Sequence, residues 1–191
     1  MIESITAKEN KKLKLISSLS AKKGRIKNNA YLVEGKRMVL EAFEYVRDAI
    51  MFIIISENFS SENKDLVTSL DESAISVYTV SDKLFKESVD TMNPQGIAAA
   101  VSIKNLSVKK SELNDINKIL ILDGISEPGN LGTIIRTAEA AGIELIYLLK
   151  GCADIYNPKV VRSTMGSIFR TEFVFADNAE ILNDVKKHGF K

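Results

Sequence analysis

The residues best suited to chemistry lie in and just after the stretch Asp123–Gly132, which joins a predicted buried strand to a predicted helix. Open α/β sheets usually bind ligands at this position, outside the carboxyl ends of their strands. The stretch supplies Asn130, Gly132 and Arg136, and we expect the helix to start between Asn130 and Arg136. Arg136 could therefore face the same crevice as the loop, where its guanidinium suits bidentate binding of a phosphate or ribose-phosphate group.

Plainer interpretations of these residues stay open at this point. The glycines could form only a tight turn between a strand and a helix. Arg136 could lie along its helix and pair with Glu139 or Glu144, as exposed arginines often do.

Two common nucleotide sites are disfavoured by the same stretch. Gly124 and Gly129 have the spacing of a phosphate-binding loop, but Asn130 and Leu131 follow where that loop requires Lys and then Ser or Thr. The dinucleotide fingerprint G-x-G-x-x-G is also absent, which argues against an ordinary Rossmann enzyme.

The composition indicates a compact soluble protein rather than a membrane or metal protein. Of the 191 residues, 45% are hydrophobic and 27% are charged, close to soluble averages. The longest apolar run, Ala49–Ile55, is too short to span a bilayer, and the first residues lack a secretory signal. Cys152 has no second cysteine to pair with, and His188 is the only histidine. We therefore expect a cytoplasmic protein with no membrane contact and no metal site.

The basic charge is concentrated at the start of the chain. Met1–Arg37 holds ten Lys or Arg against three Asp or Glu, whereas the remainder holds sixteen against twenty-two. Such a segment is typical of a surface that binds a polyanion, although a solvated lysine-rich helix face has the same composition. Within it, Lys22–Asn29 has no periodicity and is predicted to be an exposed basic loop.

Alternating strands and helices predict α/β layers. Thr6–Glu9 fits a capping box that would begin the first helix. Strands are then expected at 31–33, 49–56, 75–80, 96–103, 118–122, 143–149 and 169–175, and helices at 36–46, 60–70, after Ser81, up to Ala141, at 160–165 and at 179–188. The polar stretch Lys104–Asn117 separates two such patterns, so we expect one domain over residues 1–105 and another over 117–191.

The segment Asn130-Leu-Gly132-Thr-Ile-Ile-Arg136, with its small-residue helix and Gly142, resembles the first signature of the SpoU (TrmH) family of RNA ribose 2′-O-methyltransferases. Asn157–Phe169 is similar to a second family stretch. Tyr31–Arg37 and Asn93–Ile97 resemble the family's ribosomal-protein-like (L30e-like) RNA-binding domain. The resemblance covers nearly the whole chain.

The resemblance implies a SPOUT methyltransferase domain, S-adenosylmethionine as the methyl donor of the full-length enzyme, rRNA or tRNA as the partner, and a homodimer. It marks Arg136 as catalytic, with Asn130 fixing the loop or contacting the ribose, and it places Arg162 and Ser163 on a helix beside the RNA. For the remaining RNA contacts we expect the basic residues near the N-terminus: Lys22, Lys23, Arg25, Lys27, Lys36 and Arg37.

The family's Gly-x-Glu-x-x-Gly loop and terminal Ser-Leu-Asn-Val-Ser helix do not occur in this sequence. We therefore expect a C-terminally truncated, incomplete methyltransferase domain, with the cofactor-binding loops beyond Lys191 and no cofactor bound to this chain. A non-catalytic RNA-binding protein or fragment is the alternative function.

Overall fold

The computed structural model describes residues 2–103, 116–177 and 183. The chain forms two compact units, one of residues 1–103 with 156–158 and one of residues 104–155 with 159–191. Within the described residues, no helix is both long enough and apolar enough to cross a membrane. The domain ranges expected from the sequence remain predictions.

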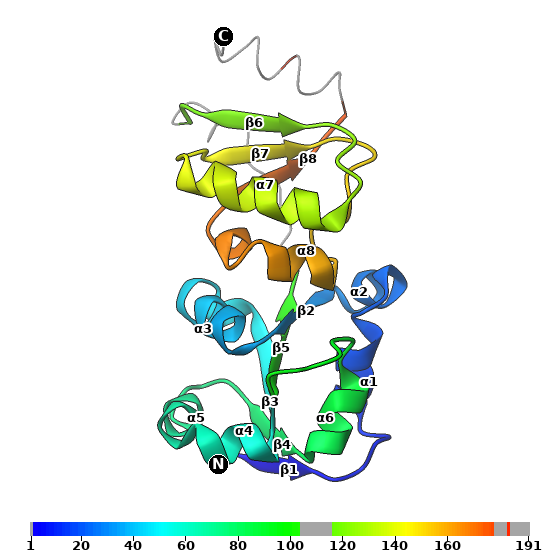
Figure 1. The fold of residues 1–191 in the computed structure, drawn as a ribbon, viewed down its shortest axis with the longest axis vertical. Helices are drawn as coiled ribbons and strands as arrows, with labels where there is room; N and C mark the ends of the chain where they lie inside the picture. The colour runs from blue at the N-terminus through cyan, green and yellow to red at the C-terminus, as the bar shows by residue number, and fades with distance from the viewer. Residues whose placement is uncertain (1, 104–115, 178–182, 184–191) are drawn as a thin grey trace. The chain divides into compact units, whose positions relative to one another are not determined.

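The first unit is a five-stranded mixed sheet with helices on both faces (Figure 1). The strand order is β1-β4-β3-β5-β2, in which β1, β4 and β3 are parallel and β5 is antiparallel to both β3 and β2. The strands are β1 (Glu3–Ile5), β2 (Ala30–Glu34), β3 (Ile50–Ser56), β4 (Val77–Val80) and β5 (Ile97–Ser102). The α/β class predicted from the sequence is confirmed.

Helices α1 (Lys11–Ser18) and α6 (Asp82–Ser88) share one hydrophobic core with the sheet. Helices α3 (Lys36–Tyr45), α4 (Glu57–Glu62) and α5 (Lys64–Asp71) lie on the other face (Figure 1). The short helix α2 (Lys22–Asn28) follows α1, and a 3-10 turn, η1 (Arg47–Ala49), precedes β3. Because β3 and β5 are covered on both faces, they are almost continuously apolar.

In its described residues, the second unit has a three-stranded parallel sheet in the order β6-β7-β8. Its elements are β6 (Ile119–Leu122), α7 (Pro128–Ala140), β7 (Leu145–Leu148), α8 (Pro158–Ser163), η3 (Ser167–Phe169) and β8 (Glu172–Phe175). Parallel neighbours require crossover connections, and α7 supplies the first, along one face of the sheet (Figure 1). Gly142 follows the end of α7 with φ +72°, as expected of a glycine that closes a helix.

Two sequence predictions about the N-terminal segment are wrong. The first helix does not begin at the Thr6 capping box, because the preceding residues pair with β4 as strand β1. It begins instead after Asn10, whose side chain accepts the N–H of Lys12 at 2.8 Å. The stretch after Ala21 is helix α2 rather than a loop.

The other element predictions agree with the structure to within a few residues, with two exceptions. The helix expected at 60–70 is two helices, α4 and α5, because the backbone of Asn63 leaves the helical region between them. The helix expected at 179–188 falls outside the described residues, apart from Asn183. Ser81 caps α6 as predicted, with its hydroxyl accepting the N–H of Leu84.

Candidate catalytic and RNA-binding site

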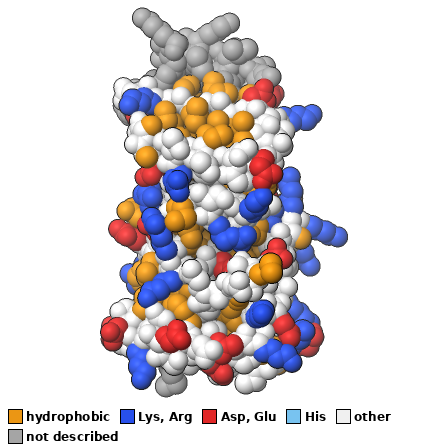
Figure 2. Space-filling model, viewed as in Figure 1, with side chains coloured by type: hydrophobic (Ala, Val, Ile, Leu, Met, Phe, Trp, Pro, Cys, Tyr) orange, Lys and Arg blue, Asp and Glu red, His pale blue; other side chains and the backbone are white. Residues whose placement is uncertain are grey.

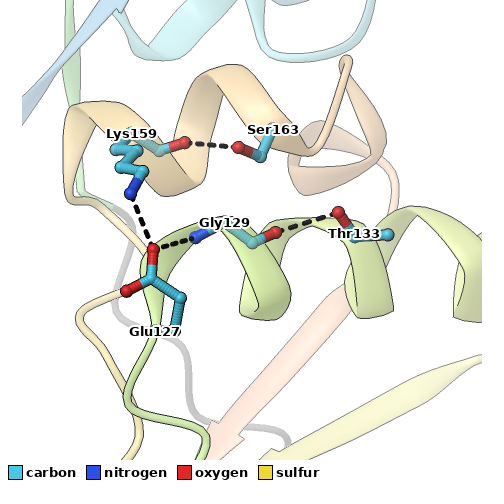
Figure 3. A network of polar contacts seen from close by, with 5 residues as sticks. All are labelled: Glu127, Gly129, Thr133, Lys159 and Ser163. Atoms are coloured by element: carbon cyan, nitrogen blue, oxygen red, sulfur yellow. Dashed lines mark hydrogen bonds and ion pairs between the residues drawn. The ribbon is translucent and has the colours of Figure 1, made fainter.

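The start of α7 is fixed by an acidic cap. Pro128 occupies the first turn, where its missing N–H costs nothing. The carboxylate of Glu127 accepts the N–H of Gly129 at 3.5 Å and the ammonium group of Lys159 at 2.6 Å (Figure 3). The Lys159 hydrogen bond, followed by that of Gly129, holds the pKa of Glu127 below its usual range. The start of α7 is thereby tied to α8.

Gly132 brings α7 and α8 into close contact. A Cβ added at Gly132 would lie 2.5 Å from Cβ of Ser163 and 2.8 Å from the carbonyl oxygen of Val160. Any larger residue would therefore push the two helices apart. The glycine predicted as part of a chemical motif has a packing function in this structure.

Asn130 and Arg136 are both exposed on α7. The helix begins at Pro128, so the predicted start between these two residues is wrong. Six residues separate them within one helix, which is about 9 Å along its axis and a third of a turn around it. Arg136 comes one turn after Gly132, so it lies on the side of α7 that meets α8.

The pairing of Arg136 with a nearby glutamate does not occur in the described part of the chain. Glu139 is bound instead by Arg170, with Nε 2.9 Å from Oε1, and by the hydroxyl of Ser167 at 3.2 Å. Glu144 accepts the backbone N–H of Asn117 at 3.2 Å. The guanidinium of Arg136 is therefore left at the surface.

The Glu139–Arg170 pair is a feature that the sequence analysis missed. It joins α7 to the end of η3, and the Arg170 hydrogen bond holds the pKa of Glu139 below its usual range. No local sequence signal identifies this pair, because its members are far apart in the chain. The same holds for Glu127 and Lys159.

Helix α8 carries the other residues expected beside the RNA. Arg162 and Ser163 are both half-buried. The hydroxyl of Ser163 donates to the carbonyl of Lys159 at 2.8 Å, and the hydroxyl of Thr133 on α7 donates to the carbonyl of Gly129 at 2.9 Å (Figure 3). The RNA-binding roles of Arg162 and Ser163 remain predictions.

Of the four basic residues predicted near α2, three are exposed: Lys22, Lys23 and Lys27. Arg25 is the exception, with only 3% of its surface exposed. Its Nη1 donates to the carbonyls of Leu19 and Ser20, each at 2.8 Å. These carbonyls lie at the end of α1, where helix carbonyls lack internal partners, so Arg25 caps α1 from inside the protein.

Lys36 and Arg37 are exposed at the start of α3. Gly35, with φ +98°, turns the chain into this helix. The N–H of Lys36 donates to Oε1 of Gln95 at 2.8 Å, and its ammonium group donates to Oδ1 of Asn63 at 2.6 Å. The stretches 31–37 and 93–97 therefore lie side by side.

An open groove runs along the start of α3. Its volume is 490 Å³, and we call it the basic groove after Lys36 and Arg37. Its other lining residues are Leu40, Glu41, Glu44 and Gln95, so its basic and acidic side chains are equal in number. In Figure 2, Lys and Arg side chains are frequent over the part of the first unit that holds α2, β2 and α3, whereas Asp and Glu are more frequent near β1 and α4. Gln95 lies in the stretch Asn93–Ile97 that resembles the family, but it is not among the site residues predicted from the sequence.

Two family models match separate parts of the chain. The SpoU rRNA Methylase family matches residues 117–191, and the MRM3-like substrate binding domain matches residues 10–99. The 23S rRNA (guanosine(2553)-2′-O)-methyltransferase RlmP of Bacillus subtilis is 33% identical over 190 residues, which cover 100% of this chain and 72% of that protein. The chain belongs to the SpoU rRNA methylase family.

The matched region is only part of the length of other SpoU relatives. An uncharacterized tRNA/rRNA methyltransferase of Synechocystis is 31% identical over 87% of this chain and 60% of its own length. Human mitochondrial rRNA methyltransferase 3 is 32% identical over 78% of this chain and 36% of its own length. An AdoMet-bound rRNA methyltransferase from Sinorhizobium meliloti has a TM-score of 0.80 and 26% identity over 98% of this chain and 69% of that one.

S-adenosylmethionine is the cofactor of the SpoU family. An open α/β sheet would bind it at the carboxyl ends of its strands, here those of β6 and β7. Gly124 follows β6 with φ +63°, and a Cβ added there would meet nothing within 4 Å. The space beside this glycine is open rather than enclosed.

Proposed function

We propose that this chain forms the RNA-binding unit and part of the catalytic unit of an RNA ribose 2′-O-methyltransferase that acts on rRNA or tRNA, with S-adenosylmethionine as methyl donor. The observation that carries the proposal is the arrangement at α7. Gly132 packs against α8, while Asn130 and Arg136 of the same signature stay exposed. Since the chain spans 36% to 72% of the relatives described above, the activity of the whole protein is part of the proposal.

Arg136 is proposed as the catalytic residue. A ribose 2′-hydroxyl is a weak nucleophile that must be oriented and must lose its proton, so most of the catalytic effect comes from positioning. A guanidinium stays protonated in proteins and is a poor base. It is well suited to hold the adjacent phosphate with two hydrogen bonds and to stabilise developing alkoxide charge.

The rest of the proposed RNA contact divides between the two units. Lys22, Lys23 and Lys27 on α2 would bind phosphates, with Lys36 and Arg37 at the basic groove. Arg25 is left out of this set because it is buried. In the second unit, Asn130 would contact the ribose, and Arg162 and Ser163 would lie beside the RNA. The cytoplasm and a homodimer are the location and assembly that the proposal implies.

A non-catalytic RNA-binding protein is the second candidate. It is favoured by the exposed lysines of α2. The two candidates make different predictions for an assay with radiolabelled S-adenosylmethionine and rRNA or tRNA transcripts. Label recovered as a 2′-O-methylnucleoside supports the enzyme. RNA binding without any transfer by the intact protein would support the second candidate.

A further inference from the structure

The loop between α6 and β5 forms a pocket next to the basic groove. The volume of this pocket, which we call the loop pocket, is 450 Å³. Its lining includes the buried rings of Phe59 and Phe85 and the exposed side chains of Asn58, Met92, Asn93 and Gln95. Gln95 lines both the loop pocket and the basic groove.

The wall of the loop pocket is held in place before any ligand binds. Gly96 has φ +78°, and a Cβ added there would lie 2.7 Å from Oγ of Ser56 and 2.8 Å from Cβ of Phe59. The N–H of Ser56 also donates to the carbonyl of Gly96 at 2.8 Å. A wall already fixed against β3 and α4 loses little conformational entropy when a ligand enters.

The polar groups of the loop pocket favour a ligand that carries N–H donors and one carbonyl acceptor. Oε1 of Gln95 accepts the N–H of Lys36, which leaves its amide N–H₂ as the group that can donate to a ligand. Glu62, Asp82 and Lys86 also line the pocket, so its charged side chains carry one net negative charge. The two carboxylates can accept hydrogen bonds from the amino and ring N–H groups of a base.

We propose that the loop pocket binds the guanine base of an unstacked RNA nucleotide whose phosphate lies on Lys36 and Arg37. The Watson–Crick edge of guanine presents two adjacent N–H donors that match a carboxylate, and an O6 acceptor that matches an amide N–H. Unstacked bases are recognised by such edge contacts together with contacts to the ring face. Met92, which is 84% exposed, supplies a polarisable side chain for that face.

This inference rests on the RNA-binding part of the proposed function, and it assigns a base specificity to the first unit. The test is fluorescence anisotropy with four short single-stranded RNAs that differ only in the central base. The RNA with guanine is expected to bind about five-fold or more tightly than the other three, the discrimination of a good bidentate contact. Replacing the carboxylates by Glu62→Gln with Asp82→Asn is expected to abolish this preference. Glu57→Gln, on the same helix but outside the pocket lining, is the matched control and should retain it.

A second readout uses the unmodified sequence. In a sample with labelled methionine methyl groups, the guanine-containing RNA should shift the resonance of Met92 and leave that of Met51, which is 45% exposed on β3. Equal affinity for all four RNAs with no shift of Met92 would overturn the guanine assignment while leaving RNA binding intact. Failure to bind any of the four RNAs would instead contradict the RNA-binding part of the proposed function.

Discussion

At the scale of single residues, Arg25 shows how a basic side chain in a basic segment can serve the fold instead of a ligand. Three lysines of α2 extend into solvent, whereas the guanidinium of Arg25 turns inward and binds two carbonyls at the end of α1. Charge composition could not show which of the four basic residues is buried and which are exposed. Whether a residue of α2 is buried depends on which face of α2 packs against α1.

Arg25→Ala should therefore lower stability and leave phosphate contacts intact. Hydrogen bonds from a charged group to buried carbonyls are worth about 1.5–3 kcal/mol, so we expect a loss of about that size in the free energy of unfolding, measured by urea titration. Lys27→Ala, on the exposed face of the same helix, is the matched control and should change stability by less than about 0.5 kcal/mol. Equal effects of the two substitutions would show that Arg25 has no capping function.

The element scale is best illustrated by α7, whose two helical glycines have different surroundings. Gly132→Ala would place a methyl group 2.5 Å from Ser163, whereas Gly129→Ala would place one 3.7 Å from the carboxylate of Glu127. Overpacking of this kind costs about 1–3 kcal/mol. We expect that loss for Gly132→Ala and almost none for Gly129→Ala, measured by thermal or urea unfolding. Similar stabilities for the two variants would contradict the close crossing of α7 and α8.

The Glu139–Arg170 pair predicts a pH-dependent contribution to the second unit. The folded-state pKa of Glu139 lies below its ordinary value of 4.5, so the stabilisation is present above that value and is lost as the pH falls through the folded-state pKa. For a partly exposed pair, Glu139→Gln should cost about 1 kcal/mol near neutral pH. The difference from wild type should shrink in acid. A constant difference across this range would contradict the ion pair.

Elements with a local signal could be predicted from the sequence. The apolar runs of β3 and β5 identified two central strands, and Gly142 marked the end of α7. Strand β1 could not be predicted, because it has only three residues and forms by pairing with β4, which is distant in sequence. Helix α2 has no apolar stripe to reveal it, since Ile26 is 69% exposed.

For the candidate site too, the sequence could indicate residues in a contiguous motif but not the contacts that position them. Asn130, Gly132 and Arg136 could be proposed from the sequence because the signature is contiguous. The partners that hold this helix, Lys159 on Glu127 and Arg170 on Glu139, depend on the path of the chain through space. The close contact that makes Gly132 necessary depends on the same path.

At the scale of the whole molecule, the distribution of charge predicts how RNA binding responds to salt. Each phosphate contact with a single strand contributes about −0.7 to the slope of log affinity against log salt concentration. Replacing Lys22, Lys23 and Lys27 together by Ala should weaken RNA binding at low salt and make that slope shallower by about 2. Filter binding over a range of salt concentrations measures both. An unchanged slope would show that α2 does not contact phosphates.

The central claim is that Arg136 serves ribose methylation of RNA. The most direct measurement is a map of 2′-O-methyl groups on the rRNA and tRNA of cells that lack this gene, complemented with wild type, Arg136→Lys or Arg136→Ala. Lys keeps the charge but lacks the bidentate fork. The account predicts that one 2′-O-methyl group disappears in the deletion strain and returns with wild type but with neither variant, although both variants fold. Full restoration by Arg136→Ala, or no lost methyl group in the deletion strain, would contradict it.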